Sequence, residues 1–191
     1  MKNLVHRLTF ATLALAGLAV TLAVPAAAGS AAPLKIVAFG DSLTAGYGLP
    51  AQDTFPAKLE QALRAQGHNV EIDNAGVSGD TASGGLSRVD WSIPDGTDAV
   101  IVELGANDML RGIDPKVTRQ ALDQILAKLK ARNIAVLLCG MRAAPNLGAD
   151  YGRDFEAMFA DLAKKYDVVY YPFFLDGVAT QAQFALRDGL H

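Results

Sequence analysis

The sequence predicts a three-layer α/β/α domain built on a five-stranded parallel sheet. Two observations support this fold class: short apolar runs alternate with longer segments of helical periodicity, and polar clusters directly follow several of the apolar runs. Strands that alternate with helices pair in parallel through right-handed crossovers, which place helices on both faces of the sheet. Ligands of such sheets bind where the strands end, so the polar clusters are the first candidates for a functional site.

The expected elements follow one another in regular order. Strands are expected at 34–40, 69–73, 98–105, 134–140 and 168–174, and helices at 54–67, 114–133 and 151–166. The helix at 114–133 has the clearest pattern, because Asp114 is a capping residue and Pro115 suits the first turn. Its predicted buried face repeats every four residues, at Val117, Ala121, Ile125 and Leu129.

Length, composition and charge limit the possible functions. A chain of 191 residues that is 51% hydrophobic can bury a substantial core and is expected to form one domain. The formal charge of −3 supplies no basic surface for nucleic acid or anionic lipid. Nucleic-acid binding is therefore not expected.

Residues 1–28 have the pattern of an export signal. Lys2 and Arg7 precede an uncharged apolar run at 8–24, and small residues at Ala26 and Ala28 form a cleavage site. The alternative is an uncleaved membrane anchor, which Pro25 and the Ala-x-Ala pattern disfavour. The expected mature protein is a single domain at 29–191, without stable membrane insertion and located in the periplasm or secreted.

The cysteine content argues against thiol and metal chemistry. Cys139 is the one cysteine of the sequence, so an internal disulfide cannot form. It lies in the apolar run IAVLLCG, where a small buried thiol is the ordinary interpretation. No metal-ligand spacing occurs, and no metal or organic cofactor is expected.

A serine, an aspartate and a histidine form the candidate catalytic set. Ser42 follows the first predicted strand and Gly40, where its hydroxyl would lie at the sheet edge; alternatively Ser42 or its neighbour only caps a helix. His191 has Asp188 three residues before it, a spacing that lets the carboxylate orient Nδ1 and leaves Nε2 as a base. His68 belongs to a turn at the opposite edge and is expected to be solvated.

Three groups are candidates for stabilising an oxyanion. The backbone N–H of Ser42, the N–H of Gly79 and the side-chain amide of Asn107 all belong to segments that follow strands. The alternatives are a plain turn glycine for Gly79 and a local turn for Asn107.

Four sequence blocks together resemble those of the GDSL or SGNH hydrolases. They read FGDSLTAGYG, NAGVSGDT, ELGANDMLRG and DGLH, in that order along the chain. The residues of these blocks are especially similar to those of the thioesterase I, lysophospholipase L1 and arylesterase branch. The resemblance implies a flavodoxin-like sheet in the order 2-1-3-4-5, Ser42 as nucleophile, Asp188 with His191 as its relay pair, and an oxyanion hole formed by Ser42, Gly79 and Asn107.

The resemblance also suggests where an acyl chain binds. In that branch the segment at 109–113 lies along the acyl chain, so Met109, Leu110 and Ile113 are implied as contacts for a lipid tail. Alternatively, these residues pack as a hydrophobic staple against the next helix.

Members of the family usually continue with Pro-Asn and a final helix after the histidine. This sequence stops at His191, so the domain is expected to lack that helix, with weak activity and reduced stability.

The expected function is hydrolysis of a small carboxylic ester or thioester by a monomeric serine enzyme through an acyl-enzyme. One alternative is a carbohydrate O-deacetylase of the same family. Another is a non-catalytic binding domain on the same scaffold, because a fold does not determine a function. No phosphate-binding glycine motif of the G-x-x-x-x-G-K or G-x-G-x-x-G type occurs in the sequence.

Overall fold

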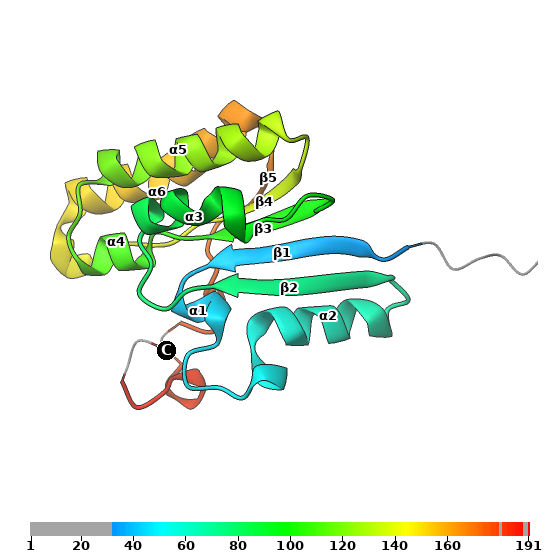
Figure 1. Ribbon diagram of the computed structural model, residues 1–191. Coiled ribbons are helices and arrows are strands. Elements are labelled where there is room, and N and C mark those ends of the chain that lie inside the picture. The colour runs from blue at the N-terminus through cyan, green and yellow to red at the C-terminus, as the bar shows by residue number, and fades with distance from the viewer. Residues whose placement is uncertain (1–31, 180, 189–190) are drawn as a thin grey trace, which may run out of the picture. The chain divides into compact units, whose positions relative to one another are not determined.

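A computed structural model describes residues 32–179, 181–188 and 191 (Figure 1). Five strands pair in parallel in the order β2-β1-β3-β4-β5. They are β1 (Leu34–Gly40), β2 (Val70–Gly76), β3 (Ala99–Glu103), β4 (Ala135–Cys139) and β5 (Val169–Tyr171). The sheet and its strand order confirm the predicted fold class.

Helices cover both faces of this sheet. Figure 1 shows α3 (Ala82–Ser92), α5 (Pro115–Ala131) and α6 (Ala149–Tyr166) over one face and α2 (Phe55–Ala65) beneath the other. The remaining elements are short: the helices α1 (Ser42–Ala45) and α4 (Ala106–Leu110), and the 3₁₀ turns η1 (Ala51–Asp53), η2 (Pro145–Leu147) and η3 (Ala182–Phe184). Both α1 and α4 begin at the carboxyl end of a strand, where the candidate site residues lie.

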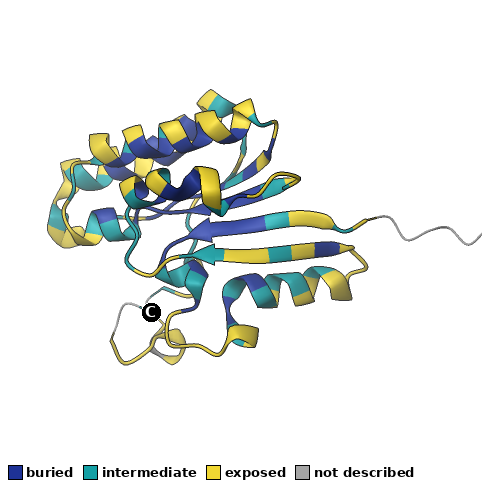
Figure 2. Ribbon diagram, viewed as in Figure 1, coloured by how far each residue is buried: buried dark blue, intermediate teal, exposed yellow. Residues whose placement is uncertain are grey.

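The main core lies between the sheet and the layer of α3, α5 and α6 (Figure 2). Alternate residues of the central strands point into it, as period-two geometry requires. Its fully buried large side chains include Phe39, Leu104, Leu122, Ile125, Phe155 and Phe159. The expectation for α5 needs one correction, because Val117 is 47% exposed although Ala121, Ile125 and Leu129 are buried.

The helix α3 was not expected, since its segment reads as a glycine-rich loop. Thr81 caps the helix, and its hydroxyl accepts a hydrogen bond from the Gly84 N–H at 3.1 Å. The buried face of α3 includes Gly85 and Arg88 beside Ala82 and Val89, so it shows little apolar periodicity. Tertiary packing therefore outweighs the low intrinsic helix propensity of this segment.

The expected leader at 1–28 lies outside the described residues and stays a prediction. Among the helices that the structure describes, none combines the length and apolar character that a membrane crossing requires.

Candidate active site

Asp41 and Ser42 occupy the junction between β1 and α1. The Asp41 carboxylate caps the helix, because Oδ1 accepts a hydrogen bond from the Leu43 N–H at 3.0 Å. Ser42 is the first helical residue. Since Asp41 performs the capping, the Ser42 hydroxyl is free of that role and is directed to another partner.

That partner is His191. The distance between His191 Nε2 and Ser42 Oγ is 2.8 Å, and the distance between His191 Nδ1 and Asp188 Oδ2 is 2.7 Å. The Asp188 carboxylate also accepts a hydrogen bond from the His191 backbone N–H at 3.0 Å. The Tyr47 ring lies against the imidazole, with a centroid separation of 4.6 Å. The structure thus brings the three predicted catalytic residues into one hydrogen-bonded chain.

Gly79 and Asn107 line the same cavity as Ser42 and His191. Gly79 follows β2 and adopts φ of +84°, a left-handed conformation that favours glycine. Asn107 lies in α4, and its amide donates one hydrogen bond to Asp41 Oδ2 at 3.0 Å. An amide nitrogen carries two hydrogens, so one donor of Asn107 remains for a ligand.

A buried carboxyl pair lies behind Ser42. Asp41 and Glu103 are both fully buried. Glu103 Oε2 accepts hydrogen bonds from the Thr44 hydroxyl at 2.7 Å and from the Asp41 N–H at 3.3 Å. Burial and the nearby charge of Asp41 raise the pKa of Glu103 well above its ordinary value. Burial also raises the pKa of Asp41, although hydrogen bonds from Leu43 and Asn107 oppose that shift.

The helix that carries Asn107 is tied to its neighbours by Asp108. This buried carboxylate accepts hydrogen bonds from the Ala82 N–H at 2.8 Å and the Thr118 hydroxyl at 3.0 Å. It therefore joins α4 to the first turns of α3 and α5. The sequence alone does not single out Asp108, because an acidic residue that follows a strand is equally typical of a solvated turn.

A cavity of about 440 Å³ opens beside the Ser42 hydroxyl. Met109 and Leu110 line it as expected, whereas Ile113 is not among its lining residues. The Ile113 carbonyl instead accepts a hydrogen bond from the Tyr151 hydroxyl at 2.9 Å. Sequence reasoning missed several side chains that later segments bring to the cavity: Met141, Arg142, Phe173 and Leu175, together with Tyr47 of the first block.

Two further side chains are placed as expected. His68 is exposed in the turn before β2, and Cys139 is buried in β4. Burial raises the pKa of the Cys139 thiol to about 12, which excludes a thiolate nucleophile at neutral pH. No cluster of three potential metal ligands occurs within residues 32–179, 181–188 and 191.

A parallel α/β sheet with a serine, histidine and aspartate in contact at its carboxyl edge is typical of serine hydrolases. The sequence profile of the GDSL-like lipase/acylhydrolase family matches residues 38–191. The chain belongs to this family.

The chain is also similar to individual proteins of this family. The chain is 39% identical over 163 residues to thioesterase 1/protease 1/lysophospholipase L1 of Escherichia coli (strain K12), covering 85% of this chain and 77% of that protein. It is 38% identical over 165 residues to an arylesterase of Vibrio mimicus, covering 86% and 82%. The crystal structure of AlinE4, an SGNH-hydrolase family esterase, superposes with a TM-score of 0.79 at 51% identity, covering 82% of this chain and 84% of that one.

Proposed function

We propose that this chain is an exported, monomeric esterase and thioesterase that forms an acyl-enzyme on Ser42. The observation that carries the proposal is the 2.8 Å contact between Ser42 Oγ and His191 Nε2 beside the cavity. The names of its relatives, an arylesterase and a thioesterase/lysophospholipase, support both ester and thioester substrates.

In the first half-reaction Ser42 Oγ attacks the substrate carbonyl while His191 Nε2 takes the hydroxyl proton. Asp188 holds the imidazole through Nδ1 and stabilises its positive charge. The tetrahedral intermediate collapses, His191 returns the proton to the leaving alcohol or thiol, and the acyl group stays on Ser42. Water then attacks the acyl-enzyme by the same route and releases a carboxylic acid, without a cofactor.

Negative charge develops on the carbonyl oxygen during both half-reactions. The N–H groups of Ser42 and Gly79 and the free Asn107 amide hydrogen are the donors we assign to it. Donors fixed before the reaction need no reorganisation, which is why they stabilise a transition state strongly. The hydrogen bond from Asn107 to Asp41 supports this role, because it restricts the orientation of the amide.

The acyl group is assigned to the apolar part of the cavity. This part offers hydrocarbon surface to an acyl chain, and it is lined by Met109, Leu110, Met141, Phe173 and Leu175.

Residues 1–28 are assigned to a leader that directs the protein to the periplasm or the medium. An exported protein whose first residue lies far from Gly29 would contradict that assignment.

Hydrolysis of p-nitrophenyl esters from acetyl to dodecanoyl tests the proposal. We expect turnover by the wild-type protein and its loss, by about a thousandfold or more, in Ser42→Ala. Leu110→Ser should shift the preference toward shorter acyl chains. Val117→Ser, at a residue of similar exposure outside the cavity, should leave the profile unchanged. Activity confined to the acetyl ester would favour a deacetylase, and a folded protein without turnover would favour a binding domain.

A further inference from the structure

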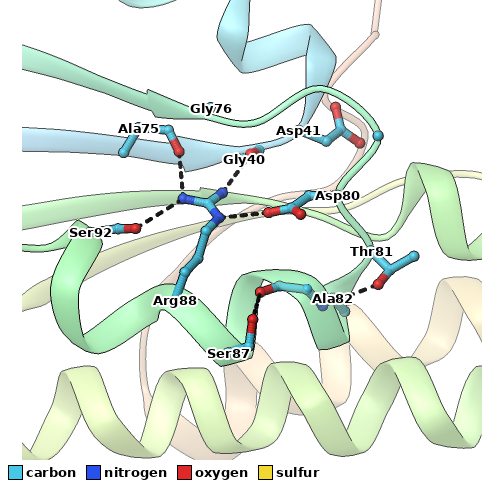
Figure 3. Close-up of polar contacts among 12 residues, drawn as sticks. Gly40, Asp41, Ala75, Gly76, Asp80, Thr81, Ala82, Ser87, Arg88 and Ser92 are labelled. Carbon is cyan, nitrogen blue, oxygen red and sulfur yellow. Dashed lines mark hydrogen bonds and ion pairs between the residues drawn. The ribbon is translucent and has the colours of Figure 1, made fainter.

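Arg88 is a buried cation in a part of the molecule that the proposed reaction does not use. It lies in α3 (Figure 3). Its exposed fraction is only 5%. Removing a charged side chain from water is costly unless other groups compensate its charge and its hydrogen bonds. The folded protein must therefore supply an opposite charge and hydrogen-bond acceptors to Arg88.

The guanidinium has four polar partners, one of which is the Ser92 hydroxyl, at 3.2 Å from Nη1. Nε lies 2.6 Å from Asp80 Oδ2 in an ion pair, Nη2 donates to the Gly40 carbonyl at 2.9 Å, and Nη1 donates to the Ala75 carbonyl at 2.8 Å. The guanidinium also lies over the Phe39 ring, 4.1 Å from its centroid. The planar fork of arginine can reach all of these groups at once, which a lysine ammonium cannot do.

These contacts join the two segments that carry oxyanion donors. Gly40 lies two residues before Ser42 at the end of β1, and Asp80 directly follows Gly79 after β2. The Gly40 carbonyl also accepts a hydrogen bond from the Val77 N–H at 3.0 Å. Arg88 thus ties the end of β1 to the turn that bears Gly79.

The Gly79 peptide itself is held by a second arginine, Arg111. The Arg111 guanidinium donates to the Gly79 carbonyl at 2.7 Å. Arg111 is exposed, whereas Arg88 is enclosed, so the buried side supplies the firmer anchor. A rigid separation between the Ser42 and Gly79 N–H groups is what an oxyanion hole requires, because a small misplacement weakens the developing hydrogen bonds.

We propose that Arg88 is a positioning residue for the oxyanion hole, which sets the distance between the Ser42 and Gly79 N–H groups through Gly40 and Asp80. This inference rests on the proposed function. Because Arg88 is buried outside the cavity, we expect it to affect kcat and not the binding of substrate.

The test compares Arg88→Lys with Arg132→Lys. Arg132 is a matched control, because Nη2 also donates to two backbone carbonyls, those of Ile93 at 2.8 Å and Pro94 at 3.1 Å, in the loop before β3. We expect Arg88→Lys to lower kcat for a p-nitrophenyl ester by about 10- to 100-fold, with KM changed less than threefold, below the 100- to 1000-fold typical of losing a whole oxyanion donor. Arg132→Lys should keep the wild-type kcat.

Both variants are assayed well below their melting temperatures, and rates are divided by the active-site concentration from titration with a phosphonate ester. If Arg88→Lys does not fold, Asp80→Asn replaces it, since it weakens the same ion pair. Wild-type kcat in the folded variant, or an equal kcat loss in Arg132→Lys, overturns the inference. Undiminished turnover by Ser42→Ala would instead overturn the proposed function, so the two failures are distinguishable.

Discussion

Glu103 is a buried carboxyl group that lies behind Ser42 and has a cost for the stability of the folded protein. Its side chain is fully buried at the end of β3, and within the described chain its Oε1 atom has no hydrogen-bond partner. Its other oxygen holds the Thr44 hydroxyl and the Asp41 N–H on either side of Ser42. The carboxyl group therefore orders the turn that carries Ser42, while burial and the charge of Asp41 raise its pKa and disfavour its charged form.

The raised pKa of Glu103 predicts a pH-dependent stability. A carboxyl group whose pKa is higher in the folded than in the unfolded protein binds more protons when folded, so the free energy of unfolding falls as pH rises above about 4.3. We expect the melting temperature of Glu103→Gln to fall less steeply from pH 5 to pH 8 than that of the wild type. Calorimetry across this range measures the slopes, with the exposed Glu71→Gln as control. Equal slopes for wild type and Glu103→Gln would contradict the assignment.

At the scale of elements, the sequence predicts best what depends on local pattern. The sequence predicts three such features: the order of the strands along the chain, the helix cap at Asp114, and the polar residues after β1, β2 and β3. The helix α3 is not predicted, because Gly85 and Arg88 occupy its buried face, and the groups around them come from the sheet and from Leu104 after β3. For the same reason the cavity residues Met141 and Phe173 escape prediction, since the segments 141–147 and 172–178 reach the cavity only through the folded sheet.

The close approach of α1 and β2 at Gly76 predicts that a side chain cannot be added there, in contrast to Gly152 of α6. A Cβ atom on Gly76 would lie 2.2 Å from the Ala45 backbone nitrogen, a distance that only backbone movement can relieve. A Cβ on Gly152, inside α6, would meet nothing nearer than 3.8 Å. We expect Gly76→Ala to lower the free energy of unfolding by about 1–3 kcal/mol or more. Gly152→Ala should raise it by about 0.5–1 kcal/mol, because alanine is the better helix former.

Urea denaturation of both variants measures these changes. A Gly76→Ala protein as stable as the wild type would show that α1 and β2 do not pack closely at Gly76.

At the scale of the whole molecule, packing around β4 isolates Cys139 from solvent. The thiol is 2% exposed in β4, and burial together with the charge of Glu103 raises its pKa to about 12. Thiol reagents react with the thiolate, so the folded protein should be protected at neutral pH.

We expect Cys139 to react with a disulfide reagent only when the sheet opens. The measured rate in native buffer should be at least about a hundredfold below that in 6 M guanidinium chloride. A Cys139→Ser variant controls for reagent consumption by other groups. A native rate close to the denatured one would place the thiol at the surface.

The pairing of Ser42 with His191 spans 149 positions of the chain. During synthesis on the ribosome, the serine is made long before the histidine that is its proposed base. Every shorter nascent chain consequently carries a hydroxyl with no base beside it. In the proposed reaction the nucleophile and its base therefore meet only when the whole domain has folded, so ester hydrolysis would also report that folding is complete.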